Sequence, residues 1–200
     1  MSRKERRNRK IAGKALIATG SFLIVFVIAI NVIDLVKSRF AINEFKQAQT
    51  QIVVAKIDDS DNKNDNVTSR DDAAMCLLRI PKINLEEAVK EGSTRGVLSS
   101  ALGHVENTAM PGEDGNCCIA GHRNYAFGKY FNRLDEITTG DVIELETKDN
   151  LYQYEVVGVE VVQPEDVSVL DYEEGQNLTL ITCTPILIGS HRLIVHAIMK

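Results

Sequence analysis

Short runs of alternating apolar and polar residues, separated by turn signals, fill the chain from about Ala74 to its last residue. The alternation is clearest in "DVIELET" and "LYQYEVVGVEVV", and the "KDN" between them is typical of a hairpin turn. Further runs of this kind are "MCLLRI", "LEEAV", "GNCCIAGH", "NLTLITC" and "HRLIVHAIM". Seven or eight strands in residues 74–200 predict an all-β domain, a small antiparallel barrel or sandwich. Short helices are plausible only at "TRGVLSSAL", "FGKYFNRL" and "PEDVSVL".

The N-terminus has a different composition. "MSRKERRNRK" carries six Lys/Arg, and an apolar run from Leu16 to Val36 follows it. As a helix this run would be about 31 Å long, close to the thickness of a bilayer core. A signal peptide is the alternative, but the run is long for one, and "IAINVIDLVK" offers no small-residue cleavage site. We therefore expect a cytoplasmic basic segment at 1–14, an uncleaved transmembrane helix at 15–37, and all later residues outside the cell.

A linker is expected at 38–73. Its first part, "SRFAINEFKQAQTQIVVA", lacks Gly and Pro and can continue the preceding helix. Its second part, "KIDDSDNKNDNVTSRDD", has too few apolar side chains to fold and is interpreted as a solvated acidic spacer.

Net charge argues against nucleic acid as a partner. The first 40 residues hold nine of the 23 Lys/Arg and two of the 28 Asp/Glu, which leaves 14 against 26 and a net charge of −12. Phosphate contacts need clustered basic residues, so the domain that follows is a poor nucleic-acid binder.

Three strand ends carry polar groups that a hydrophobic core would exclude. "CCIAGH" ends in His122, "TLITC" ends in Cys183, and "SHRLIVHA" begins a strand with Arg192. A thiol attacks an amide as its thiolate, which a basic neighbour such as His122 favours. His122 could also protonate the leaving amine, and Arg192 could stabilise the oxyanion of a tetrahedral intermediate.

The alternation of side chains along a strand sorts these residues by face. Thr179, Ile181 and Cys183 share one face of their strand, and Ala120 shares a face with His122. On the last strand, Arg192 and Ile194 point the same way. Cys183, His122 and Arg192 could then surround one apolar floor, although the sequence permits this arrangement rather than requiring it.

Simpler interpretations exist for each residue. A cysteine in an apolar strand is more often an inert core residue than a nucleophile. His104, in "LGHVENT", is a rival to His122, although its surroundings are typical of a loop. Cys117 and Cys118 are interpreted as structural, and no spacing of the four cysteines resembles a zinc or redox pair.

Taken together, "TLITC", the arginine nine positions later in "HRLIV", and "IAGHR" about sixty residues upstream resemble the signature of sortases over roughly residues 74–200. Sortases are membrane-anchored cysteine transpeptidases of Gram-positive bacteria. The resemblance implies an eight-stranded β-barrel in which Cys183 is the nucleophile, His122 the general acid/base and Arg192 the stabiliser of substrate carbonyl or oxyanion. It implies a groove floor of Ala120, Thr179, Ile181 and Ile194.

The implied substrates are surface proteins bearing a sorting signal similar to Leu-Pro-x-Thr-Gly, cleaved between Thr and Gly. The acyl group then passes to an amine on a cell-wall precursor or on another protein. No cofactor or metal is implied, although the acids of "QPEDVSVLDYEE" would permit calcium, which some sortases bind. "TCTP" and "SHRLIV" are similar to classes C and D. No proline precedes Pro81 to form the lid usual in class C, which favours a class D-like enzyme over a pilus-polymerising one.

Overall fold

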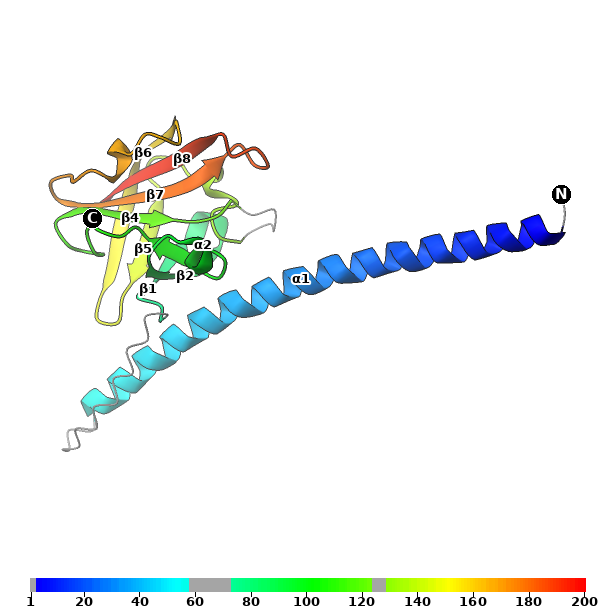
Figure 1. Cartoon of the computed structure of the whole chain (residues 1–200). Helices are drawn as coiled ribbons and strands as arrows, with labels where there is room; N and C mark the ends of the chain where they lie inside the picture. Colours follow the sequence, from blue (N-terminus) through cyan, green and yellow to red (C-terminus); the bar gives the residue numbers. More distant parts are fainter. Residues whose placement is uncertain (1–2, 58–72, 124–128) are drawn as a thin grey trace. The chain divides into compact units, whose positions relative to one another are not determined.

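A closed barrel of eight strands forms the C-terminal part of the chain, in the order β1-β2-β3-β4-β7-β8-β6-β5 (Figure 1). The computed structural model describes residues 3–57, 73–123 and 129–200. The strands are β1 (Cys76–Ile80), β2 (Leu85–Glu91), β3 (Leu102–His104), β4 (Gly115–Ala120), β5 (Val142–Glu146), β6 (Leu151–Val162), β7 (Gln176–Thr184) and β8 (His191–Met199). The eight-stranded barrel predicted from the sequence is confirmed.

Two of the eight pairings are parallel, which corrects the expectation of a purely antiparallel barrel. β2 pairs with β3 and β4 pairs with β7 in parallel, and the other pairs are antiparallel. Parallel neighbours need a connection that carries the chain back to the starting edge. A crossover through helix α2 (Arg95–Leu98) supplies it between β2 and β3, and the β5–β6 hairpin lies between β4 and β7 in the sequence.

Of the other segments predicted as helical, "PEDVSVL" contains a short helical turn, whereas "FGKYFNRL" shares only its last residue, Leu134, with one. Residues Leu134–Glu136 and Ser168–Leu170 form 3-10 turns named η2 and η3, and a third, η1 (Pro81–Ile83), links β1 to β2. Part of "FGKYFNRL" lies outside the described residues.

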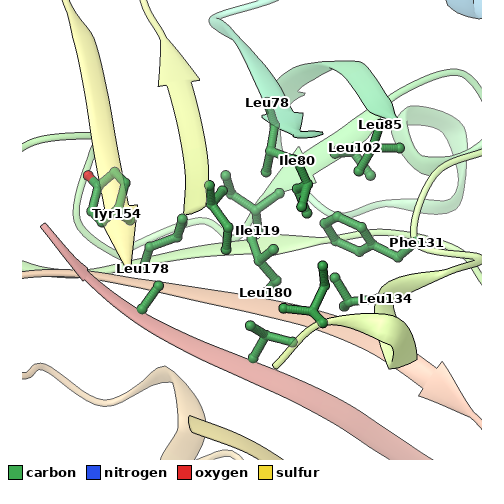
Figure 2. Close-up of a cluster of buried hydrophobic side chains, with 14 of the residues drawn as sticks. Leu78, Ile80, Leu85, Leu102, Ile119, Phe131, Leu134, Tyr154, Leu178 and Leu180 are labelled. Carbon is green, nitrogen blue, oxygen red and sulfur yellow. The ribbon is translucent and has the colours of Figure 1, made fainter. Parts of the chain in front are cut away.

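The barrel interior is filled by one apolar cluster (Figure 2). Leu178 and Leu180 of β7, Ile119 of β4 and Tyr154 of β6 are fully buried in it. Phe131, between β4 and β5, closes the same cluster. The even-numbered residues of β7 therefore face the core, which leaves Thr179, Ile181 and Cys183 on the outer face.

The chain divides into two compact units, residues 1–37 and 38–200, and helix α1 (Arg3–Ile57) contributes to both. Within the residues that the structure describes, no helix has the length and apolarity needed to cross a membrane, so the transmembrane helix expected at 15–37 is not found. Most of the predicted acidic spacer, residues 58–72, lies outside the described residues.

The part of α1 that follows Ser38 packs on the barrel, where the sequence had predicted a linker. Ile42 and Phe45 are 3% and 2% exposed and lie against Leu77 of β1 and Ala88 of β2. Polar contacts border this apolar patch: the Lys46 ammonium lies 2.9 Å from a Glu86 carboxylate oxygen. Burial alone would raise the pKa of Glu86, but hydrogen bonds from Lys46 and Arg79 lower it below its ordinary value.

Candidate active site

The parallel pairing of β4 and β7 brings two of the predicted catalytic residues together. Ala120 at the end of β4 lies opposite Ile181 of β7, and the Gly121 amide continues the ladder by donating to the Ile181 carbonyl at 3.0 Å. Because both strands run in the same direction, His122 and Cys183 emerge at the same end of the sheet, each two residues beyond its member of the Ala120–Ile181 pair.

The third predicted residue comes from the antiparallel neighbour on the other side of β7. Arg192 of β8 is the direct register partner of Cys183. Its guanidinium Nη1 donates to the carbonyls of Gly189 at 3.2 Å and of His191 at 3.1 Å. Arg192 therefore lies beside the cysteine and braces the turn that connects β7 to β8.

A pocket of about 200 Å³ lies at this end of the sheet and opens to solvent. Its lining consists of His122, Arg123, Cys183 and residues 185–189 of the β7–β8 turn. Cys183 and His122 are both half-buried, so they share a cavity that solvent and a substrate can reach. Gly189 borders the thiol closely, since a Cβ built on it would lie 3.9 Å from the Cys183 sulfur.

The close packing around Gly121 favours glycine immediately before His122. A Cβ built on Gly121 would lie 2.5 Å from Leu102 Cδ2 and 2.6 Å from Phe131 Cδ2, well inside ordinary carbon–carbon contact. The Gly121 carbonyl accepts a hydrogen bond from Thr182 Oγ1 at 2.8 Å. The backbone that carries His122 is thus held between the core and the strand that carries Cys183.

The other three cysteines are unsuited to nucleophilic chemistry. Cys76, Cys117 and Cys118 are free thiols at most 1% exposed. Burial raises the pKa of Cys76 to about 12 and also raises the pKa of Cys118 to about 12. The interpretation of Cys117 and Cys118 as structural agrees with this burial.

His104, the rival general acid, lies elsewhere. It belongs to β3 rather than to the loop predicted for it, and only 2% of it is exposed. Its Nδ1 lies 2.9 Å from a Glu91 carboxylate oxygen, and its Nε2 lies 3.0 Å from the Ala109 carbonyl. Both ring nitrogens are therefore used in holding β3 to its surroundings.

The four residues implied as the groove floor share the outer face of the sheet but differ in exposure. Ala120 and Ile181 are half-buried beside the pocket, whereas Thr179 and Ile194 are 1% and 0% exposed. Thr179 Oγ1 donates to Asn116 Oδ1 at 2.8 Å. Contact of Thr179 or Ile194 with a substrate stays a prediction, and it would need the side chains around them to move.

The segment between β6 and β7 contacts this outer face. The Asn116 amide nitrogen donates to the carbonyls of Val169 at 3.1 Å and Asp171 at 3.2 Å. The segment contains the acidic residues of "QPEDVSVLDYEE", for which the sequence would permit calcium binding. Among the described residues, no three His, Cys, Asp or Glu side chains gather in a way that could hold a metal ion. Asp166 instead accepts hydrogen bonds from the amide and hydroxyl of Ser168.

Sequence reasoning missed Arg123 and Thr184, although each follows a predicted catalytic residue directly. Arg123 lines the pocket, and its Nη1 donates to Thr184 Oγ1 at 2.9 Å. The "HR" and "CT" pairs could have suggested this contact only if the parallel pairing of β4 and β7 had been known.

This arrangement can support nucleophilic catalysis on an acyl group. A thiol and an imidazole open into one cavity, and Arg192 is the register partner of Cys183 on the neighbouring strand, although it is not among the residues that line the cavity. Thiolate attack, proton transfer by imidazole and charge stabilisation by guanidinium are the three functions that amide cleavage by cysteine requires.

Comparison with known proteins agrees with the geometry. A family model described as "Sortase domain" matches residues 78–200. Sortase A of Bacillus anthracis is 31% identical over 154 residues, which cover 76% of this chain and 73% of that protein. Sortase D of Bacillus subtilis (strain 168) is 33% identical over 110 residues, and the match spans 54% of its length.

Solved structures extend the similarity. A Clostridium perfringens Sortase D5 transpeptidase aligns with 82% of this chain and 98% of its own, at 33% identity and a TM-score of 0.66. Sortase C1 of GBS Pilus Island 1 aligns with 82% of this chain and 92% of its own, at 28% identity and a TM-score of 0.67. From its barrel, its pocket and these matches, we conclude that the chain belongs to the sortase family.

Proposed function

We propose that this protein is a cysteine transpeptidase that cleaves a Leu-Pro-x-Thr-Gly-like sorting signal and joins the acyl fragment to an amine. The observation that carries the proposal is the shared pocket of Cys183 and His122, with Arg192 as the register partner of Cys183 on β8. Membership of the sortase family supports the same chemistry.

The reaction would proceed through a thioester. The Cys183 thiol gives its proton to His122, and its sulfur attacks the carbonyl carbon of the scissile amide, so that a carbon–sulfur bond forms as the carbonyl oxygen becomes an oxyanion. Arg192 stabilises that charge, while His122 donates a proton to the leaving amine as the carbon–nitrogen bond breaks. An incoming amine then attacks the thioester, loses its proton to His122 and releases Cys183.

The proposed class is D-like, with anchoring of surface proteins to a cell-wall precursor as its role. Similarity to Sortase D of B. subtilis and to the C. perfringens Sortase D5 transpeptidase supports this choice. A pilus-type enzyme is the second candidate, because Sortase C1 of GBS Pilus Island 1 aligns over the same 82% of the chain.

A product assay tests the proposal. The protein is incubated with a small panel of sorting peptides and candidate amines, including a peptidoglycan-like peptide and a pilin-like lysine peptide, and products are identified by mass spectrometry. Ligated product that disappears in Cys183→Ala and His122→Ala supports a transpeptidase. Hydrolysed peptide without ligation at any amine concentration would instead indicate a cysteine hydrolase, and the choice of amine separates the two candidate roles.

The cellular location stays a prediction, with the N-terminus cytoplasmic and the barrel at the outer surface. The basic residues of the first ten positions and the substrates of the family support it. A protease added to intact cells should remove the barrel, and a barrel that is digested only after lysis would contradict this orientation.

A further inference from the structure

Arg123 makes side-chain contacts that link the chain just beyond His122 to the chain just beyond Cys183 and to the segment around η2. Its Nη1 donates to Thr184 Oγ1 at 2.9 Å, its Nη2 lies 2.8 Å from Asp135 Oδ1, and its Nε donates at 3.5 Å to the Asn132 carbonyl. The side chain is only 5% exposed, although it borders the solvent-open pocket. The guanidinium is thus directed at protein acceptors on three sides.

The positions of these partners in the sequence give the contact its significance. Arg123 directly follows His122, and Thr184 directly follows Cys183. Beyond Ala120 and Ile181 the β4–β7 ladder continues through the Gly121 amide and then the Thr182 hydroxyl, which donates to the Gly121 carbonyl. The Arg123–Thr184 hydrogen bond is therefore the next link between the two segments, and it lies one residue beyond His122 and Cys183.

A charge-assisted hydrogen bond is suited to this position. Arginine is always charged, and its planar fork loses little freedom when several of its donors are fixed at once. Asp135, the middle residue of η2, forms an ion pair with the other terminal nitrogen of the fork. Because Asp135 offsets the charge and Thr184 occupies a donor, Arg123 is suited to holding the two strand ends rather than to binding an oxyanion.

We propose that Arg123 and Thr184 form a positioning pair that sets the separation of the His122 imidazole and the Cys183 thiol. The pair acts through the catalytic residues and does not itself contact the reacting atoms. This inference rests on the proposed function, because it gives the pair a role in the same cysteine chemistry. Its loss should impair the chemical step much more than substrate binding.

Thr184→Val is the most selective test, because it removes the hydroxyl and keeps the volume. We expect kcat for ligation to fall by up to about a hundredfold, the cost of a misplacement of about 1 Å, while KM changes less than about threefold. Thr184→Ser restores the hydroxyl and should recover most of the lost kcat. Arg123→Gln should reduce kcat similarly, and the double variant should be no slower than the slower single variant, since both changes remove one interaction.

Arg133→Gln is the matched control. Arg133 also makes an ion pair in this segment, with Glu136, and donates to the Ile83 carbonyl at 3.0 Å, but it has no contact with Thr184 among the described interactions. It should lower the unfolding midpoint and leave kcat unchanged. Equal losses of kcat in Arg133→Gln and Thr184→Val would show that the pair contributes only stability, and the positioning role would be refuted.

A substrate-free readout separates failure of this inference from failure of the proposed function. The rate of Cys183 alkylation by iodoacetamide at fixed pH is measured for the wild type, His122→Ala, Thr184→Val and Thr184→Ser. The inference expects the rate to fall in His122→Ala and Thr184→Val and to recover in Thr184→Ser, whether or not any sorting peptide is ligated. A rate that falls in His122→Ala but is unchanged in Thr184→Val overturns it.

Discussion

Gly121→Ala is the substitution for which the structure gives the most specific expectation. The added Cβ would lie 2.5 Å from Leu102 Cδ2 and 2.6 Å from Phe131 Cδ2, and both side chains are fully buried. To restore ordinary carbon–carbon contact, the neighbours or the backbone must retreat by about 1 Å. Overpacking of this kind costs about 1–3 kcal/mol. With a urea m-value of about 2 kcal/mol/M, a loss of about 2 kcal/mol lowers the unfolding midpoint by about 1 M.

The same substitution should affect catalysis, because the strained residue directly precedes His122. A shift of about 1 Å in the imidazole would cost about a hundredfold in kcat. The measurements are urea unfolding followed by circular dichroism and ligation kinetics in the absence of urea. Gly158→Ala is the control: its Cβ would meet only His196 Cδ2 at 4.0 Å, so its midpoint should stay the same or rise.

A double-mutant cycle tests the steric cause directly. Leu102→Ala alone should cost about 2–5 kcal/mol through the cavity it leaves. Combined with Gly121→Ala it provides room for the new methyl group, so the double variant should be more stable than additivity predicts by about 0.5–3 kcal/mol. Strict additivity, or a Gly121→Ala midpoint equal to that of Gly158→Ala, would refute the reasoning.

Three further outcomes are expected. Phe45→Ala should destabilise residues 38–200 by about 3–5 kcal/mol in urea unfolding, because Phe45 is only 2% exposed. Phe40 is 68% exposed, so Phe40→Ala should change the urea midpoint of unfolding little. A hydrogen bond from Tyr172 holds the pKa of Asp114 below its ordinary value. The Asp114 carboxylate therefore contributes to stability above its unfolded-state pKa, and this contribution is lost as the pH falls through the lower pKa of the folded state. Asp114→Asn should reduce this loss of stability at acid pH, as measured by unfolding at a series of pH values. A thiol reagent should modify one cysteine in the native protein, Cys183, and four in denaturant, as counted by mass spectrometry; rapid modification of a second native thiol would contradict the burial described above.

Side-chain parity was the most dependable part of the sequence reasoning. The two-residue period of a strand is a property of the backbone, so it holds whatever the neighbouring strands are. Leu178 and Leu180 accordingly fill the core, while Thr179, Ile181 and Cys183 lie on the opposite face. Exposure was less predictable than face, since Thr179 is buried by side chains and a segment that are distant in the sequence.

Two elements could not be predicted from local pattern. β3 has only three residues and no alternation, and it is a strand because β2 and β4 lie on either side of it. The spacing of Ala41, Ile42 and Phe45 does resemble one apolar helix face. A helical linker in solvent and a helix that packs on a domain can both be polar outside this face. The sequence alone therefore does not distinguish them, and the apolar contact with Leu77 and Ala88 does.

The convergence of the catalytic residues depends on a property that the sequence did not reveal, the direction of strand pairing. If β4 and β7 were antiparallel, His122 and Cys183 would lie at opposite ends of the sheet, and the same motifs would have no common pocket. In parallel register, "GHR" and "CTP" leave the sheet together, and the antiparallel β8 adds Arg192, its second residue. On either side of His122 and Cys183, residues that follow the ladder have a partner from the other strand: Gly121 with Thr182, and Arg123 with Thr184. The polar residues beside His122 and Cys183 thus extend strand pairing beyond the last backbone hydrogen bond. For this reason Arg123 and Thr184, which have no chemical role of their own, should still control the distance between the imidazole and the thiol.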